Sequence, residues 1–428
     1  MNHLRNCSYI LLLVSIFACT EIDNSNDDNG HNFNSNEQYV YKEYNSVSRL
    51  SLFIPLDTVA SINKKDWVDS CKMIAFSDVL EGKSESFTFR IKGRGNSTWN
   101  RPKKPYSIKF YNKESLFELP QDKSWVLLAN YFDPTHLRNS VAFYMSRTMS
   151  KLDYTPRYRY TTLEMNDKPW GLYQIGEKLK PEKERVCGDK SGFLIEVDAK
   201  AQEDEVTFKT PHMKEPLNIK EPDVKEGDED YNYIKDFILK AEHSLFSENF
   251  LDDNEGYRKY IDEESFVEWY LINEIAKNID AAMYTSCYMN FTRGGKLKMG
   301  PIWDFDLAFG NYVFGTSHLR DSLNTSVDLS VIQSEWYNRL FEDPAFKAKV
   351  KTRFSDYYAN RYDIYNYIDI KSKQIENEVY QDNKVWERLG PKDLTFDKFH
   401  EMYYSHVEKL KLWIEDRFIF LNNQYSKL

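Results

Sequence analysis

The chain has few cysteines, and their spacing gives no sign of a disulfide framework or a zinc site. Five of the 428 residues are cysteines: Cys7 and Cys19 lie near the N-terminus, and Cys71, Cys187 and Cys287 follow at wide intervals. An odd number of widely separated cysteines does not define bridges and lacks the close pairs that bind zinc. We therefore expect buried free thiols in the folded part of the chain.

Excess positive charge and long apolar runs are also missing. The formal net charge is −10 at pH 7, which argues against general nucleic-acid binding. A bound polyphosphate would therefore need a local basic patch or a metal ion. The apolar run from Tyr9 to Phe17 is too short to span a bilayer as a stable helix.

The N-terminal segment has the pattern of an export signal. Arg5 precedes the apolar run, and the ending Ser15-Ile-Phe-Ala-Cys19 resembles a bacterial lipoprotein box, in which the cysteine becomes the lipidated N-terminus. A plain signal peptide with an incidental cysteine is the alternative. We predict a lipoprotein signal peptide over 1–18 and a membrane anchor on Cys19, which places the protein in the bacterial cell envelope, at the periplasmic or surface face of the outer membrane. Residues 19–44, rich in asparagine, serine and aspartate, are predicted to form a disordered tether.

The remainder of the chain is long enough for two lobes with separate cores. Residues 49–110 are largely β in pattern, with strict alternation of apolar and polar residues over 86–92. Beyond the acidic segment 221–231, which we predict to be a surface loop, helical periodicity prevails. The prediction is an α+β protein with a β-rich N-terminal lobe (45–180) and a mostly helical C-terminal lobe (181–428).

Individual elements follow from the same patterns. Asp133 and Pro134 are residue types typical of a helix N-cap and first helical position, so a helix is predicted to begin there. The segment 166–169 predicts the turn of a hairpin. Further helices are predicted over 233–245, 265–276, 335–342, 344–358 and 399–420, and short strands over 193–198, 286–291 and 296–299.

Two carboxylates stand two residues apart in the stretch Gly300-Pro-Ile-Trp-Asp-Phe-Asp-Leu-Ala-Phe-Gly310. If the stretch is extended, Asp304 and Asp306 point to the same side; Asp280 and Asn290 lie upstream. Carboxylate and amide oxygens suit a hard divalent cation such as Mg²⁺ or Mn²⁺, which phosphoryl transfer from a nucleotide requires. The alternative is a turn in which Asp304 caps a helix and Asp306 pairs with a lysine or arginine. Glycoside hydrolysis by the two carboxylates is a third hypothesis, which nothing else in the sequence supports.

A polar glycine turn precedes a basic strand. In Gly93-Arg-Gly-Asn-Ser97 the glycines permit a close bend whose backbone N–H groups can approach phosphates. Arg94, Asn96 and Ser97 are therefore candidate nucleotide contacts, as are Lys104 and Lys109 on the strand that follows. The alternative is an ordinary hairpin turn followed by solvated lysines.

Several of these segments together resemble the spore coat protein H (CotH) kinase family, over about residues 49–310. The resemblance implies an atypical protein-kinase-like fold of two lobes and ATP-dependent phosphorylation of serine or threonine hydroxyls. The matching segments are Lys92-Gly-Arg-Gly-Asn-Ser-Thr-Trp99, Lys103-Lys-Pro-Tyr106, Trp125-Val-Leu-Leu-Ala129, Leu137-Arg-Asn139, Trp170-Gly-Leu-Tyr173 with Glu177-Lys178, the Asn278-x-Asp280 pair, and Trp303-Asp-Phe-Asp-Leu-Ala-Phe-Gly310.

The resemblance also implies roles for the acidic residues. A kinase needs an aspartate that orients the acceptor hydroxyl, followed along the chain by an asparagine and an aspartate that hold metal. Asp280, Asn290 and Asp304 occur in this order. By this resemblance Asp280 is the catalytic residue, Asp304 and Asn290 are ligands of Mg²⁺ or Mn²⁺, and Asp306 is a supporting carboxylate.

Two further positions follow from the family, and two features depart from ordinary kinases. Glu177 lies where a connector between lobes would contact adenine, and Arg138 would contact phosphate or pair with an acid. The helix predicted from Asp133 carries no glutamate that could pair with Lys109, and no His-Arg-Asp stands at the catalytic position. A different phosphate clamp is therefore expected.

Two functional hypotheses remain. The first is a metal-dependent kinase that phosphorylates an envelope or exported protein and acts as a monomer; because ATP is scarce outside the cytoplasm, it would need external ATP or another phosphoryl donor. The second is a non-catalytic or glycan-associated surface protein on a kinase-like scaffold. The joint presence of Asp280, Asn290 and Asp304 favours the first.

Overall fold

The computed structural model describes residues 39–77 and 84–428, and residues 41–428 form one compact unit. The predicted signal peptide, the lipidation residue Cys19 and the predicted tether up to residue 38 lie outside the described residues. In the part of the chain that is described, no helix is long and apolar enough to cross a membrane.

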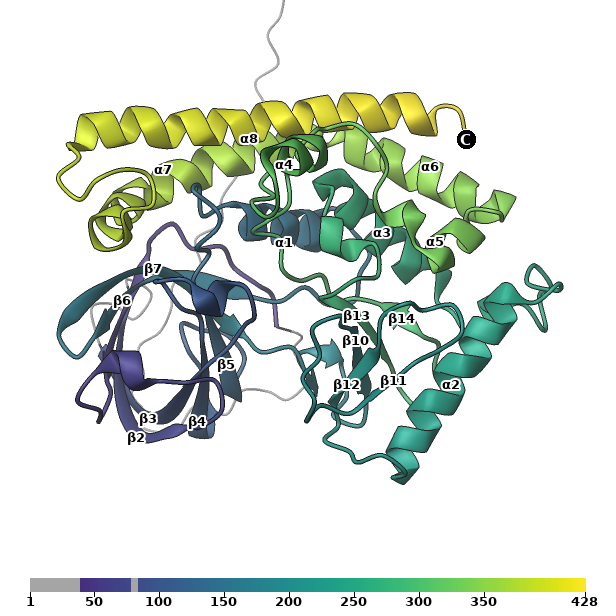
Figure 1. Ribbon diagram of the computed structural model, residues 1–428, viewed down its shortest axis with the longest axis horizontal. Coiled ribbons are helices and arrows are strands. Elements are labelled where there is room, and N and C mark those ends of the chain that lie inside the picture. The colour runs from purple at the N-terminus through teal and green to yellow at the C-terminus, as the bar shows by residue number, and fades with distance from the viewer. Residues whose placement is uncertain (1–38, 78–83) are drawn as a thin grey trace, which may run out of the picture. The chain divides into compact units, whose positions relative to one another are not determined.

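Seven strands of the N-terminal region close into a barrel in the order β1-β2-β3-β4-β5-β7-β6 (Figure 1). Neighbouring strands are antiparallel, except that β1 pairs parallel with β6 and so closes the barrel. The strands are β1 (Ser48–Phe53), β2 (Val68–Phe76), β3 (Ser84–Gly93), β4 (Tyr106–Glu114), β5 (Asp122–Leu128), β6 (Tyr158–Met165) and β7 (Lys168–Glu177).

The alternation predicted for residues 86–92 decides which side chains fill the barrel. On β3, Phe89 and Ile91 are fully buried in the barrel core, whereas Arg90 and Lys92 are half-buried on its outer surface. Successive side chains of a strand point to opposite faces, so one strand supplies both apolar core and a basic outer wall.

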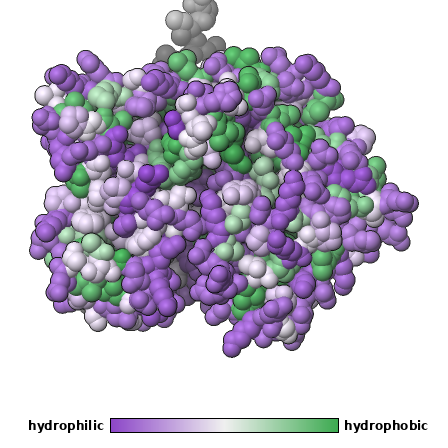
Figure 2. All heavy atoms as spheres, in the orientation of Figure 1, coloured by the Kyte–Doolittle hydropathy of each residue, from purple (hydrophilic) through white to green (hydrophobic). Residues whose placement is uncertain are grey.

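A second sheet lies beside the barrel, with the strand order β11-β12-β10-β13-β14 (Figure 1). The chain reaches it through the short parallel pair β8 (Pro181–Glu182) and β9 (Val186–Cys187). The space-filling view shows a crevice lined by hydrophilic residues between the two (Figure 2). The strands are β10 (Phe193–Val197), β11 (Thr207–Phe208), β12 (Leu217–Glu221), β13 (Cys287–Phe291) and β14 (Lys298–Met299).

Helices make up most of the C-terminal region, where α7 and α8 run antiparallel along the top of Figure 1. Near its C-terminal end α7 reaches the barrel, where the Asp382 carboxylate accepts a hydrogen bond from the backbone N–H of Leu172 on β7 at 2.8 Å. The helices are α1 (Arg138–Thr148), α2 (Glu229–Phe246), α3 (Glu263–Ala276), α4 (Ser317–Leu323), α5 (Glu335–Leu340), α6 (Pro344–Ala359), α7 (Arg361–Trp386) and α8 (Phe396–Tyr425). The α+β class is thus confirmed, with a β-rich N-terminal region and a helical C-terminal region.

Two predictions about helices were wrong or incomplete. The first helix begins at Arg138 and not at Asp133, because the Asp133 carboxylate binds the backbone N–H groups of Thr135 and Arg138 within a preceding turn. Helix α7 was not predicted: its buried apolar stripe is narrow and lies among tyrosines and charged residues. The three cysteines of the described part are free, as expected; two are buried and Cys187 is half-buried.

Candidate active site

The two carboxylates of the 300–310 stretch lie on an irregular loop after β14, here called the acid loop. Asp304 has a left-handed backbone (φ +66°), and its exposed side chain accepts a hydrogen bond from the Ser286 hydroxyl at 3.3 Å. The loop continues as turns to Gly310, and the next helix, α4, begins only at Ser317. The alternative in which Asp304 caps a helix is therefore wrong.

Asp306 is a nearly buried carboxylate that makes no ion pair with any residue the structure describes. Its side chain is 7% exposed, and among the described residues no hydrogen bond or ion pair reaches it. Burial raises its pKa well above the ordinary value, and the charges of Asp304 and Asp133 add to this effect. Burying an ionised carboxylate without a partner costs desolvation free energy. A cation bound beside Asp306 would offset that cost.

Asp280 lies close to Asp304, as the predicted constellation requires. It sits on a single turn, Ile279–Ala281, that follows the end of α3. Burial raises its pKa to about 6; Lys200 opposes this effect and the charge of Asp304 adds to it. The charge of Lys200, three residues after β10, thus acts on both Asp280 and Asp304, and no motif in the sequence indicated this residue.

One cation of the barrel region, Arg94, acts on the acid loop. The guanidinium of Arg94 lies over the Trp303 ring, 5.4 Å from its centroid. The surrounding protein desolvates Asp304 and raises its pKa, whereas the charges of Arg94 and Lys200 lower it.

Lys109 on β4 belongs to another group of positive charges. Its pKa is lowered by burial and by the charges of Arg90, Lys178 and Lys180.

The glycine turn at the end of β3 has a fixed shape. Gly93 lies against the Trp99 ring, where a Cβ atom would come within 2.3 Å of the ring, and Gly95 has φ +80°. The Lys104 ammonium donates to the Trp99 carbonyl at 2.5 Å and so closes the turn. Asn96 is exposed at its tip and Ser97 is half-buried after it. Lys104 therefore shapes the turn, and Arg94 is its cation nearest the acids.

Two side chains of helix α1 make hydrogen bonds to the backbone of the acid loop. Arg138 pairs with Asp133 at 2.5 Å and donates through Nε to the Ala308 carbonyl at 3.1 Å. The Asn139 Oδ1 atom accepts from the backbone N–H of Phe305 at 2.8 Å. Of the two roles considered for Arg138, pairing with an acid is the one found.

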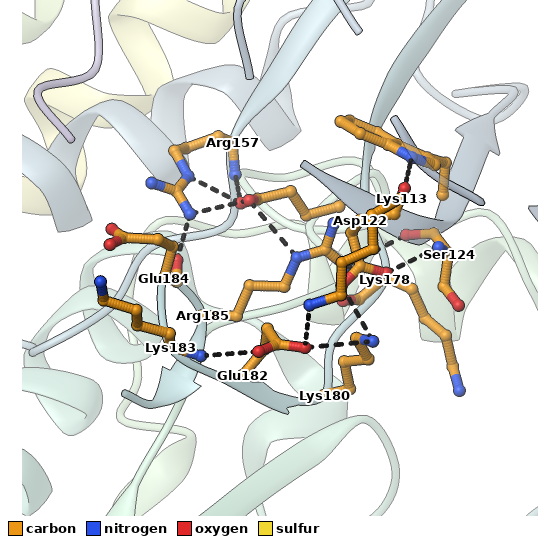
Figure 3. Close-up of polar contacts among 12 residues, drawn as sticks. Lys113, Asp122, Ser124, Arg157, Lys178, Lys180, Glu182, Lys183, Glu184 and Arg185 are labelled. Carbon is orange, nitrogen blue, oxygen red and sulfur yellow. Dashed lines mark hydrogen bonds and ion pairs between the residues drawn. The ribbon is translucent and has the colours of Figure 1, made fainter. Parts of the chain in front are cut away.

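Two candidate residues have other partners. Glu177 is fully buried and accepts from Arg157 Nη2 at 2.7 Å and from the Tyr154 hydroxyl at 2.8 Å. Arg157 and Arg185 belong to the network of polar contacts around this position (Figure 3). Asn290 donates to the Gly300 carbonyl at 2.9 Å, where it holds the start of the acid loop. Neither side chain joins the group of Asp280, Asp304 and Asp306.

The group offers hard oxygen ligands for a divalent cation. Within residues 39–77 and 84–428, no three side chains of histidine, cysteine, aspartate or glutamate are placed to hold a metal ion together. Mg²⁺ is commonly held by one or two carboxylates with substrate phosphates and water completing its shell. Asp304 and the unpaired Asp306 fit that donor set.

Asp280, the acid loop and Arg94 together make up the candidate site. The family model described as CotH kinase protein matches residues 91–421, most of the chain, and the protein belongs to this family. The matched range includes the glycine turn, α1, the acid loop and the helical region through most of α8. A search of curated proteins found no match.

Proposed function

We propose that the protein is an atypical kinase that transfers the γ-phosphoryl group of ATP, with Mg²⁺ or Mn²⁺, to a serine or threonine hydroxyl of a protein acceptor. Family membership supports a kinase-like function. The observation that carries the proposal is the electrostatic interaction of Asp304 with Asp280 and with buried Asp306, together with the opposing charge of Arg94 on Asp304.

Asp304 and Asp306 would hold the divalent cation. A divalent cation would supply positive charge that offsets the charge developing on the phosphoryl group during transfer. Asp304 is exposed and Asp306 is buried, so Asp304 would be open to a ligand while Asp306 would gain a counter-charge. Arg94 and Lys109 would neutralise the remaining phosphate charge from the barrel side.

Asp280 would orient the acceptor hydroxyl and receive its proton. The hydroxyl oxygen bonds to the γ-phosphorus, the bond between that phosphorus and the β–γ bridging oxygen breaks, and ADP leaves with the electron pair. A pKa of about 6 leaves Asp280 largely ionised at neutral pH, so it can accept a hydrogen bond from the hydroxyl.

We place the acceptor among envelope or exported proteins because residues 1–18 have the pattern of a lipoprotein signal and Cys19 that of a lipidation site. In that location the phosphoryl donor would be external ATP or another phosphorylated compound. A lipid on Cys19 would hold the enzyme near acceptors in the same membrane.

The test is the thermal stability of the purified protein with ATP plus Mg²⁺ or Mn²⁺, and with each alone. A ligand that binds only the folded state raises the midpoint by mass action. We expect a shift that needs nucleotide and metal together and that disappears in Asp304→Ala. No shift with millimolar nucleotide contradicts the proposal and favours a surface binding protein, for which glycans are the next ligands to try.

A further inference from the structure

A second group of buried and half-buried ionisable side chains lies outside the proposed site and joins three parts of the chain. Lys103 stands between the glycine turn and β4, His136 in the turn before α1, Asp382 near the end of α7, and half-buried Arg388 just after α7. We call these four residues the α7 cluster. Lys103 begins one of the segments that resemble the family, and no motif in the sequence singled out the other three.

Asp382 is the centre of the cluster. Its Oδ1 atom lies 2.6 Å from the Lys103 ammonium and accepts the N–H of Leu172 at 2.8 Å. Its Oδ2 atom lies 3.4 Å from Nε2 of His136. Lys103 and Asp382 are 0% and 1% exposed, so this carboxylate has fixed partners on the barrel and on the turn before α1.

One end of the cluster is the base of the glycine turn. Lys103 is followed by Lys104, which closes that turn on Trp99. Two residues after Lys103, the Pro105 carbonyl accepts from the backbone N–H of Arg94 at 3.2 Å. Lys103 therefore lies next to the backbone segment that holds Arg94 in place, and the charge of Arg94 acts on Asp304.

The other end is the turn before α1, the helix that contacts the acid loop. His136 lies in this turn, and its Nε2 atom is 3.4 Å from Asp382 Oδ2 and 3.0 Å from Arg388 Nη1. On α1 itself, the Asn139 Oδ1 atom accepts the backbone N–H of Phe305 in the acid loop at 2.8 Å. The cluster thus contacts both the base of the glycine turn and the turn that leads into the helix holding the acid loop.

We propose that Asp382 is a positioning residue for phosphoryl transfer: it holds α7 against the glycine turn and the acid loop, so that Arg94 and Asp304 keep the separation that the reaction needs. This inference rests on the proposed kinase function. It extends the site to α7, which carries none of the residues proposed to hold nucleotide, metal or acceptor.

Positioning explains the cluster better than stability does. A buried ion pair gains little net free energy, because the desolvation of both charges offsets their attraction. It does restrict geometry, since a fully buried carboxylate must keep its donors in place. Displacements of about 1 Å at a reacting centre lower rates by about 100-fold.

The decisive variant is Asp382→Asn, which removes the charge but keeps an oxygen for the Leu172 N–H. Asp369→Asn is the matched control: it lies on the same helix, and its carboxylate meets Lys411 of α8 at 2.8 Å on the exposed surface. Phosphoryl transfer is measured per folded protein, below both melting midpoints. We expect kcat to fall by about 10- to 100-fold in Asp382→Asn and to stay within about twofold of the parent in the control.

Two further variants keep the inference testable if Asp382→Asn folds poorly. Lys103→Met combined with Asp382→Asn removes both buried charges together, so we expect the melting midpoint to recover while kcat stays low. Arg388→Gln leaves the Lys103–Asp382 pair in place and changes only the contact with His136, and we again expect lower kcat with little change in the melting midpoint.

The outcomes separate the two proposals. If the parent transfers phosphate and the folded cluster variants match its kcat and KM, the positioning role is overturned and the kinase function stands. If the parent neither binds nucleotide with metal nor transfers phosphate, the proposed function fails and the positioning role fails with it. If Asp382→Asn lowers the melting midpoint but leaves kcat per folded molecule unchanged, Asp382 has a purely structural role.

Discussion

The side-chain oxygen of Asn139 accepts a hydrogen bond from the backbone N–H of Phe305 at 2.8 Å. This bond joins α1 to the acid loop at the residue between Asp304 and Asp306. Asn139 is 4% exposed and also donates to Asn130 at 2.9 Å, so the acid loop is part of a buried polar network and not a free surface turn.

Asn139→Ala should therefore destabilise the protein and loosen the acid loop. It leaves the buried N–H of Phe305 without an acceptor, which costs about 1–3 kcal/mol. Denaturant unfolding should show this loss, and the stabilisation by ATP with Mg²⁺ should shrink. Asn100→Ala, at an exposed position after the glycine turn, should change neither quantity. An unchanged nucleotide response in Asn139→Ala would show that α1 does not set the loop geometry.

Asp280→Asn should separate binding from transfer. Asp280 is assigned to the acceptor hydroxyl and not to the metal, so the thermal shift with ATP and Mg²⁺ should persist while phosphoryl transfer is lost, by about 100-fold or more. Asp304→Ala, by contrast, should lose both. Equal transfer by the parent and Asp280→Asn would remove Asp280 from the mechanism.

Glu196 should make stability depend on pH. Burial raises its pKa to about 7; nearby Lys220 lowers it and Asp198 raises it. Because the folded-state pKa lies above the unfolded value of 4.5, its contribution to stability falls as pH rises from about 4.5 to 7 and the penalty is complete above pH 7. Glu196→Gln should thus stabilise the protein at pH 8 by on the order of 2–3 kcal/mol and have little effect at pH 4.

The comparison is best made by denaturant unfolding of parent and Glu196→Gln at both pH values. Glu203→Gln, an exposed glutamate in the loop that follows β10, serves as the charge-matched control and should show no such difference. If the difference in free energy of unfolding between parent and Glu196→Gln is the same at both pH values, Glu196 stays ionised in the folded protein.

Gly171→Ala should disturb the contact between β7 and α7. Gly171 has φ +94°, and a Cβ atom there would lie 2.2 Å from Asp382 Oδ1. Gly294→Ala is the matched control, because Gly294 also has a positive φ of +76° but nothing within 4 Å of the added atom. In both variants the strained backbone lowers the free energy of unfolding by about 1 kcal/mol. Thermal unfolding should show a clearly larger fall in melting midpoint for Gly171→Ala than for Gly294→Ala.

The local part of this architecture was readable from the sequence. Alternation over 86–92 predicted which face of β3 carries Arg90, and short spacing placed Asp304 and Asp306 in one segment after a predicted strand. These inferences need only strand periodicity and short spacings. The start of α1 was misplaced because Asp133 caps a turn that precedes the helix, a difference that residue types alone do not reveal.

The buried charged contacts could not be predicted, because they depend on partners far away in the sequence. Glu177 looked available for a ligand, but Arg157 and Arg185 satisfy it from other segments. Lys103 gave no signal of burial, because its counter-charge Asp382 lies on a helix that the sequence pattern had not indicated. Long-range pairing of this kind is set by the packing of the whole unit.

The pairing of Lys103 with Asp382 also bears on how the chain is made. Lys103 emerges from the ribosome with the barrel strands, whereas its counter-charge follows only after nearly all of the helical region has been synthesised. Until then the base of the glycine turn carries a lysine that cannot be buried without an uncompensated charge. The buried pair between the barrel region and α7 can therefore form only after α7 has been synthesised, late in translation.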